Sequence, residues 1–510
     1  FEEWQPPFSS FFFFFSLSKH THPDYNNTNQ QSHMDATTTT TTTTTVRSPF
    51  DLPELRHRLS RFLPLKDSLS CALVSKAWTL DFVSAIWFKV DLSVHQRFTD
   101  LPTDVIAKHG HLIRVVQNAK IFSQVCALDH PNINKLRILH METTGSIKQH
   151  GHAFQIVTRN NASLQVVRVS ASYTRPDKIN NANYHVSVPA FLPSPSAFPV
   201  RPSSTIETLE FVIMWMTHDD LMTILEASPR LSKLKLVHTD VVGTPTRFFQ
   251  HTGVTVLSTS LKSIFPDVPT GLPSLLSYFP NLTTLHTWHW DSSAMTPSAR
   301  IKKDFERYCP LLKQFKLGDN KDNRIMIFVT DVVSNITRIT LQEARMTPNF
   351  VAAIVLHQAS MEKVAQLYTR GFDYEKEEVP WLQDKNYLCD SQRIQEIPRK
   401  CFQLQKLNLH QHEMRMDVVE SGEWVCKDLR KLRIRVKGLD TKEKILRTIA
   451  LWRAGCWRRW QEQATGVKVA VQEEDRLKAD KSIEARVARH LLKFEQLWWV
   501  WLGYQTWTPI

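Results

Sequence analysis

Apolar and polar positions follow one short pattern that returns along most of the chain after residue 130. Its template is apolar-x-x-apolar-x-apolar, as in INKLRI at residues 133–138, LSKLKL at 231–236 and LRKLRI at 429–434. Alternation with a period of two predicts a short β-strand that buries one face. The middle apolar anchor of each predicted strand falls at residue 136, 167, 209, 234, 264, 285, 315, 339, 364, 407 or 432.

The intervals between these anchors indicate a repeated strand-and-helix unit. Most intervals are 21 to 31 residues, and two longer ones of 42 and 43 residues leave room for insertions. Segments with helical apolar spacing fill several intervals, at residues 218–230, 271–281 and 297–310. One such unit cannot bury its own apolar face, whereas stacked units share a continuous core. The chain resembles leucine-rich-repeat proteins, whose period is roughly 20 to 29 residues, although it lacks their regular Asn in the turn.

The predicted fold class is α/β. We expect a short helical domain at residues 48–93 and an irregular leucine-rich-repeat solenoid at residues 94–440, with a curved parallel sheet and helices outside it. Residues 441–510 are predicted to form a further repeat and a cap that covers the last core layer. Within them, residues 441–464 form a basic amphipathic helix, for which binding to a membrane or to a calmodulin-like partner is the alternative interpretation.

The helical domain begins with residues 52–78, LPELRHRLSRFLPLKDSLSCALVSKAW. Leucines at residues 52, 55 and 59 fall at spacings of three and four, which predicts one face of a helix that Pro64 ends. Asp67 is the predicted N-cap of a second helix, and a third continues to Trp87 before a strand at residues 88–93. Three such short helices bury little core alone, so we expect them to pack on something else.

The same residues resemble an F-box, a motif with a characteristic order of Leu-Pro, a hydrophobic pair, Cys, Val-Ser-Lys and two Trp residues. Two positions depart from the motif: Ser68 separates Asp67 from Leu69, and Ile86 stands where Leu is usual. The positions that carry the resemblance are Leu52, Pro53, Phe62, Leu63, Asp67, Leu69, Cys71, Val74, Ser75, Lys76, Trp78, Ile86 and Trp87.

The resemblance implies that the helical domain docks on a Skp-type adaptor and, through it, on a cullin-based ubiquitin ligase. The residues expected to contact the adaptor are Leu52, Pro53, Leu55, Leu59 and Leu69. The residues expected to hold the F-box together and against the first repeat are Val74, Trp78 and Trp87. The chain would then be a non-catalytic substrate-recognition subunit whose repeats bind a protein target.

Basic residues stand at outward positions beside several strand anchors. They suggest a target with an acidic or phosphorylated surface, and the alternative is that they are ordinary solvated strand residues. The candidate target-binding residues are Lys135, Arg137, Lys233, Lys235 and Arg433. Two other functions remain open: a repeat scaffold with no ligase role, and a nucleic-acid-binding protein, for which the net charge of +13 is the only argument.

Composition limits the chemistry of the chain. It has only 13 glycines among 510 residues and no phosphate-binding, serine-nucleophile or zinc-protease motif, so we predict neither an enzyme nor a cofactor. The paired histidines at residues 19–22 and 410–412 have no metal-like partners in sequence. The seven cysteines include no CxxC pair, which favours the reducing cytoplasm or nucleus. No run of 18 apolar residues occurs, so no membrane span is expected.

Three segments are predicted to lie outside the repeats. Residues 1–47 are low-complexity and expected to be disordered, and residues 1–33, which precede Met34, are interpreted as translated upstream sequence. The proline-rich residues 189–204 are predicted to form a surface loop. Residues 370–387 are either an insertion that contacts the target or a solvated loop.

Overall fold

A computed structural model gives the fold of the chain. It describes residues 52–143, 147–171, 185–186, 188–191, 204–260, 274–288, 299–318, 330, 333–342, 346–367, 391–466, 477, 479–502 and 505–507. The expectations for residues 1–47 and 370–387, and for most of 189–204, lie outside these residues. The chain divides into two compact units, residues 1–56 and residues 57–510. Within the first unit, the described residues are 52–56, where helix α1 (Pro53–Ser60) begins.

The second compact unit, residues 57–510, begins with short helices, as the spacing of the leucines in this region predicts. After the end of α1 come α2 (Leu65–Ala72) and α3 (Lys76–Phe88). Ser75 is the N-cap of α3, where its hydroxyl accepts a hydrogen bond from the backbone N–H of Trp78 at 3.3 Å. The expected cap at Asp67 is wrong: Pro64 occupies the N-cap of α2, because a proline fits before the first turn, and Asp67 lies inside that turn.

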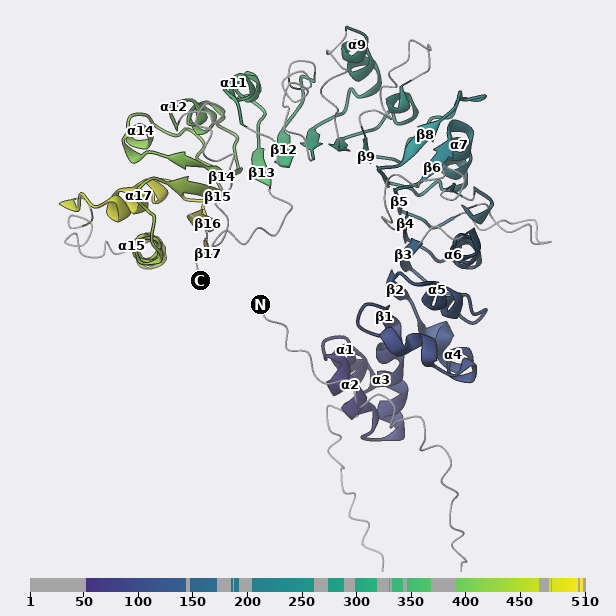
Figure 1. The fold of residues 1–510 in the computed structure, drawn as a ribbon. Coiled ribbons are helices and arrows are strands. Elements are labelled where there is room, and N and C mark those ends of the chain that lie inside the picture. The colour runs from purple at the N-terminus through teal and green to yellow at the C-terminus, as the bar shows by residue number, and fades with distance from the viewer. Residues whose placement is uncertain are drawn as a thin grey trace, which may run out of the picture. The chain divides into compact units, whose positions relative to one another are not determined.

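One sheet of 15 strands runs through the rest of this unit (Figure 1). Neighbouring strands are parallel throughout, except for the last pair, and the sheet is not closed, because its two edge strands pair with one neighbour each. In spatial order the strands are β1 (Lys89–Asp91), β2 (Val115–Ala119), β3 (Ile138–Thr143), β4 (Val166–Ala171), β5 (Thr208–Val212), β7 (Lys233–Val237), β9 (Val256–Ser260), β10 (Thr284–Trp288), β11 (Gln314–Leu317), β12 (Arg338–Gln342), β13 (Lys363–Leu367), β14 (Lys406–Met414), β15 (Lys431–Val436), β16 (Trp499–Leu502) and β17 (Gln505–Trp507). A separate parallel pair joins β6 (Trp215–Thr217) to β8 (Asp240–Val242).

Most predicted anchors lie inside these strands, and two do not. Leu136 is buried in the turn before β3, and Leu139 is the residue in register with Val167 of β4. The template matches three residues early here because apolar residues recur at a spacing of three. Residue 264 lies outside the described residues. The strand between β7 and β10 is β9, in which Leu257 is in register with the anchors Leu234 and Leu285.

A seam of backbone hydrogen bonds joins the turns that precede the strands. The carbonyl of Arg114 accepts from the N–H groups of both Arg137 and Ile138, at 2.7 and 3.1 Å. The same bifurcated bond recurs from unit to unit, so the turn before each strand is fixed by the turn before its neighbour. The accepting carbonyls that follow are those of Arg137, Gln165, Glu207, Ser232, Thr255, Thr283, Lys313, Thr337, Glu362, Gln405 and Arg430.

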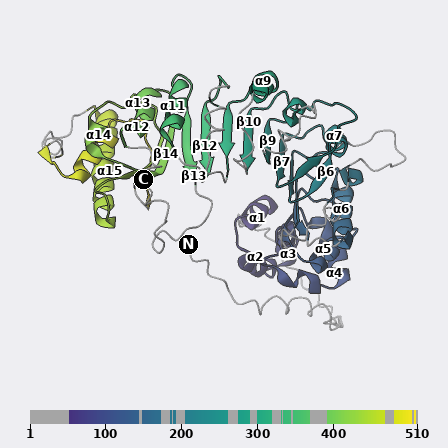
Figure 2. The same cartoon turned by 45° about the horizontal axis from the view of Figure 1, so that its top comes forward.

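Helices and short helical turns connect most of the strands. Figures 1 and 2 show α5, α6, α7, α9 and α11 on one side of the strands. The predicted helix at residues 271–281 is instead a single 3₁₀ turn, η9 (Leu275–Tyr278). The remaining helices before the C-terminal region are η4 (Gln96–Asp100), α4 (Thr103–His109), η5 (Gly110–Leu112), α5 (Phe122–Leu128), α6 (Ile147–Asn160), η8 (Val188–Phe191), α7 (His218–Ala227), α9 (Ala299–Tyr308), α11 (Pro348–Leu356), α12 (Ser391–Ile394), α13 (Glu396–Lys400) and α14 (Met416–Glu420).

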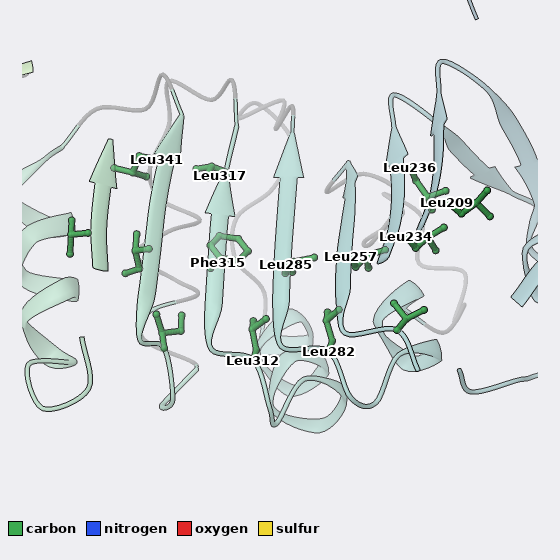
Figure 3. Packing of buried hydrophobic residues seen from close by; sticks show 14 of the residues in the cluster. Leu209, Leu234, Leu236, Leu257, Leu282, Leu285, Leu312, Phe315, Leu317 and Leu341 are labelled. Carbon is green, nitrogen blue, oxygen red and sulfur yellow. The ribbon is translucent and has the colours of Figure 1, made fainter. Parts of the chain in front are cut away.

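One continuous apolar core runs between the strands and the helices, from Val90 to Leu502. Every second strand residue points into it, as Leu285 and Phe315 do in Figure 3, while the residues between them face the opposite side. Leu282 and Leu312, from the turns before β10 and β11, extend the same core. The face opposite the core is therefore lined by residues that the backbone register places side by side.

The C-terminal region ends in α15 (Lys442–Thr465), α17 (Ile483–Leu491) and the strands β16 and β17. Helix α15 ends at Gly466, whose φ of 67° places it in the left-handed region that favours glycine. Its buried side includes Ile445, Ile449 and Trp452, whereas Trp460 is exposed. No helix in the described part of the chain is both long and apolar enough to cross a membrane.

Candidate functional site

Exposed apolar side chains are frequent in the short helices and turns that precede the sheet. Phe62 is 84% exposed and Leu80 is 78% exposed, and the other members of this group are Leu73, Val74 and Phe88. Single exposed apolar residues are common on protein surfaces, but five within 27 consecutive residues make this segment a candidate for binding a partner. We call these five residues the helical apolar group.

The residues expected to contact an adaptor are accessible. Leu52, Pro53 and Leu55 are exposed at the start of α1, while Leu59 and Leu69 are half-buried. None of the five is fully enclosed within the chain, which is a requirement for contact with a partner.

The residues expected to hold the helices together behave differently from one another. Trp78 stacks on the fully buried Phe82, with ring centroids 5.5 Å apart. Trp87 packs against the apolar core and stacks on His109 at 5.1 Å. Val74 differs from the expectation: it is 65% exposed, because it lies in the turn between α2 and α3 rather than on a helix face that meets the core.

The five basic residues expected to bind a target do not form one site. Lys135 and Arg137 are exposed in the turn before β3. Lys233 is exposed at the start of β7, but Lys235 lies 3.0 Å from Glu210, which balances its charge. Arg433 lies on β15, seven strands away from β7 in the order of the sheet. The structure therefore separates these candidates into three places.

A continuous basic row occupies four neighbouring strands instead. Backbone register pairs Arg338 of β12 with Lys363 of β13, Lys363 with Lys406 of β14, and Lys406 with Lys431 of β15. Each of these residues directly precedes a fully buried residue, so all four side chains point away from the core. At a strand spacing of about 4.8 Å, the row extends roughly 14 Å. We call these four residues the cationic row; Figure 2 shows β12, β13 and β14 side by side.

The charges of the cationic row are concentrated and poorly balanced. Arg338 donates to Glu362 at 3.0 Å, whereas the ammonium groups of Lys363 and Lys406 have no carboxylate or hydrogen-bond partner among the residues that the structure describes. Partial burial, together with Lys406, Arg338, Lys316 and Lys431, lowers the pKa of Lys363 to about 8. Burial and Lys431 also lower the pKa of Lys406.

Indole rings border the row at β15. The Lys431 ammonium lies 4.5 Å from the ring centroid of Trp498, and the Arg433 guanidinium lies 3.5 Å from that of Trp501. These cation–π contacts fix the two basic side chains at the edge of the row. Arg433 thus has a defined local partner.

The target-binding residues predicted from the sequence do not include Arg338, Lys363 or Lys406. A signal for them was available. Each stands directly before the middle apolar anchor of its template, which is the same position that Lys233 occupies. Comparing that single position across neighbouring units would have revealed the row.

The described residues contain no group of three or more His, Cys, Asp or Glu side chains that could hold a metal ion. No protein-family model matches the chain, and no curated protein matches it either.

Proposed function

We propose that the chain is the substrate-recognition subunit of a Skp/cullin/F-box-type ubiquitin ligase, with an F-box followed by a leucine-rich-repeat solenoid. The observation that carries the proposal is the helical apolar group, which leaves a short helical segment with uncovered apolar surface directly in front of a long parallel sheet. The resemblance of residues 52–87 to an F-box supplies the identity of the partner, a Skp-type adaptor.

In this proposal the chain makes and breaks no bonds. The helical segment binds the adaptor, and the sheet binds a protein target, so the target is held near a ubiquitin-charged enzyme. Tethering of this kind raises the effective concentration of the two reactants without any new catalytic group. The protein would act in the cytoplasm or the nucleus, where such ligases work.

A repeat scaffold without a ligase role is the second candidate. It is favoured by Trp87, which packs against the core of the sheet and makes the end of α3 part of the repeat array. In that case the short helices serve only to cover the first strand.

Binding of the full chain to a purified Skp-type adaptor distinguishes the two candidates. We expect the parent to bind and the double variant Leu52→Ala/Pro53→Ala to lose binding. Leu356→Ala is the matched control, because Leu356 is 71% exposed on α11, far along the chain. A folded parent that does not bind the adaptor, or a double variant that binds as the parent does, would refute the ligase proposal and favour the scaffold.

A further inference from the structure

The cationic row carries an inference that does not depend on the ligase proposal. Four cations in register on adjacent strands repel one another, and such an arrangement is kept only at a cost to the stability of the chain. The paired carboxylate of Arg338 offsets one of the four charges, and the indole of Trp498 partly offsets another. Lys363 and Lys406, in the centre, receive no such compensation within the described residues.

We propose that the cationic row is a binding site for an acidic, extended peptide segment of another protein, held by Lys363 and Lys406 at its centre. The row is linear and lies on the face of the sheet that points away from the core. Neighbouring positions on the same face are short: Thr340, Ala365 and Asn408 follow the row two residues later on β12, β13 and β14. These short side chains are buried, whereas the four longer basic residues beside them stay at least partly exposed and can be reached by an incoming chain.

The geometry suits anionic peptide side chains. Adjacent cations lie about 4.8 Å apart at the backbone, so two of them can contact one carboxylate or phosphate group. In an extended peptide the side chains of one face recur every two residues, roughly 6.6 Å apart, which brings successive acidic groups onto the row. Glutamate, aspartate and phosphorylated serine share this chemistry.

Single-stranded nucleic acid fits the surroundings less well. Such ligands combine phosphate contacts with bases stacked on open aromatic rings. The indole rings of Trp498 and Trp501 beside the row are already engaged by Lys431 and Arg433. The ring of Trp499, which is in register with Lys431, packs edge-on against Trp501 with ring centroids 6.1 Å apart. Peptide binding needs no stacking surface, and we therefore favour it.

Because Lys363 can lose its proton, binding to the cationic row should depend on pH. The charged groups that act on Lys363 are Lys406, Arg338, Lys316 and Lys431, from β14, β12, β11 and β15, and all of them favour its neutral form. With a pKa of about 8, Lys363 is mostly charged at pH 7 and mostly neutral at pH 9. If the peptide binds only the charged form, affinity falls about tenfold between these two pH values.

The experiment measures binding of fluorescein-labelled peptides to the full chain by fluorescence anisotropy. One peptide is an oligoglutamate, a second carries phosphoserines, and a third is the uncharged oligoglutamine of the same length. We expect one or both acidic peptides to bind and oligoglutamine not to bind. The double variant Lys363→Met/Lys406→Met should lose at least tenfold in affinity, whereas Lys427→Met, at an exposed lysine outside the row, should bind as the parent does.

Lys363→Arg separates a charge effect from a packing effect. Arginine stays charged at pH 9, so this variant should bind at pH 7 as the parent does and keep most of its affinity at pH 9. The double methionine variant should also remain folded, because it removes like-charge repulsion.

Three outcomes would overturn the proposal. The first is that neither acidic peptide binds; the second is that the methionine variant binds as tightly as the parent. The third is that a single-stranded oligothymidylate displaces the acidic peptides through the same two lysines and binds more tightly, which would make the row a nucleic-acid site. Adaptor binding is measured separately, so each proposal can fail alone.

Discussion

Asn160, the last residue of α6, provides a sharp test of how neighbouring units are joined. Its side chain is 1% exposed and makes hydrogen bonds across the gap to the turn before β3. The amide oxygen accepts from the backbone N–H of Leu136 at 2.9 Å, and the amide nitrogen donates to the carbonyl of Ile133 at 3.0 Å. Asn160→Ala removes both partners and leaves a donor and an acceptor buried without hydrogen bonds.

Each buried group left without a partner costs about 1 to 3 kcal/mol, so the loss of two partners should lower local stability by about 2 to 6 kcal/mol. The lost hydrogen bonds lie in one part of the sheet, so the effect is best measured where that part opens locally. Hydrogen exchange of peptides that cover residues 133–143 is the suitable assay. A loss of 2 kcal/mol corresponds to exchange roughly 30-fold faster in this segment.

Thr158→Ala is the matched control, because Thr158 is exposed on the same helix and its hydroxyl bonds only within the helix, to the carbonyl of Phe154. Its effect should stay within about 0.5 kcal/mol. Exchange in residues 133–143 of Asn160→Ala that matches the exchange of Thr158→Ala would show that the amide does not join the units.

Three further predictions concern burial. Phe82→Ala should destabilise the short helices by about 3 to 5 kcal/mol, since Phe82 is fully buried beneath Trp78, and limited proteolysis should then cut residues 60–88 faster than in Leu80→Ala. Burial lowers the pKa of His412 to about 4, so the unfolded chain binds the proton more readily and stability is lost as the pH falls below about 6.5. This residue should make the chain about 2 kcal/mol less stable at pH 5 than at pH 7 in denaturant unfolding. His412→Gln should reduce that loss. Burial raises the pKa of three thiols to about 12, so a thiol reagent at pH 8 should label the half-buried Cys71 while leaving unlabelled, in the native chain, Cys309, Cys401 and Cys426. The first prediction is contradicted if Leu80→Ala is cut as fast as Phe82→Ala. The second is contradicted by an unchanged pH profile, and the third by equal labelling of all thiols.

The sequence predicts the strands of this protein better than it predicts the site. Alternation places Val364, Leu407 and Leu432 in strands because burial of every second residue is a local property of the sequence. The cationic row is not local. Lys363 and Lys406 are far apart in sequence, and they become neighbours only through the register of β13 and β14.

The errors have physical causes as well. Residues 133–138 match the template because Ile133, Leu136 and Ile138 are apolar. Strand β3, however, begins only at Ile138, and a spacing of three cannot distinguish a turn from a strand. Val74 matches a motif position, but a motif does not state which side of a turn meets the core, and the structure leaves this side chain exposed. The prediction that Lys235 binds a target rests on its charge alone. Glu210, which balances that charge, belongs to another strand and is brought next to Lys235 only by the fold.

The seam of bifurcated hydrogen bonds sets what can change in this chain over evolution. It fixes the turn before each strand and leaves the length of the segment between two such turns free. The carbonyls of Glu207 and Ser232 mark one unit, and those of Glu362 and Gln405 mark another that is much longer, yet both pairs make the same bond. New sequence can therefore accumulate after a strand without disturbing its neighbours, and the connecting segments can diversify while the sheet that carries them stays in place.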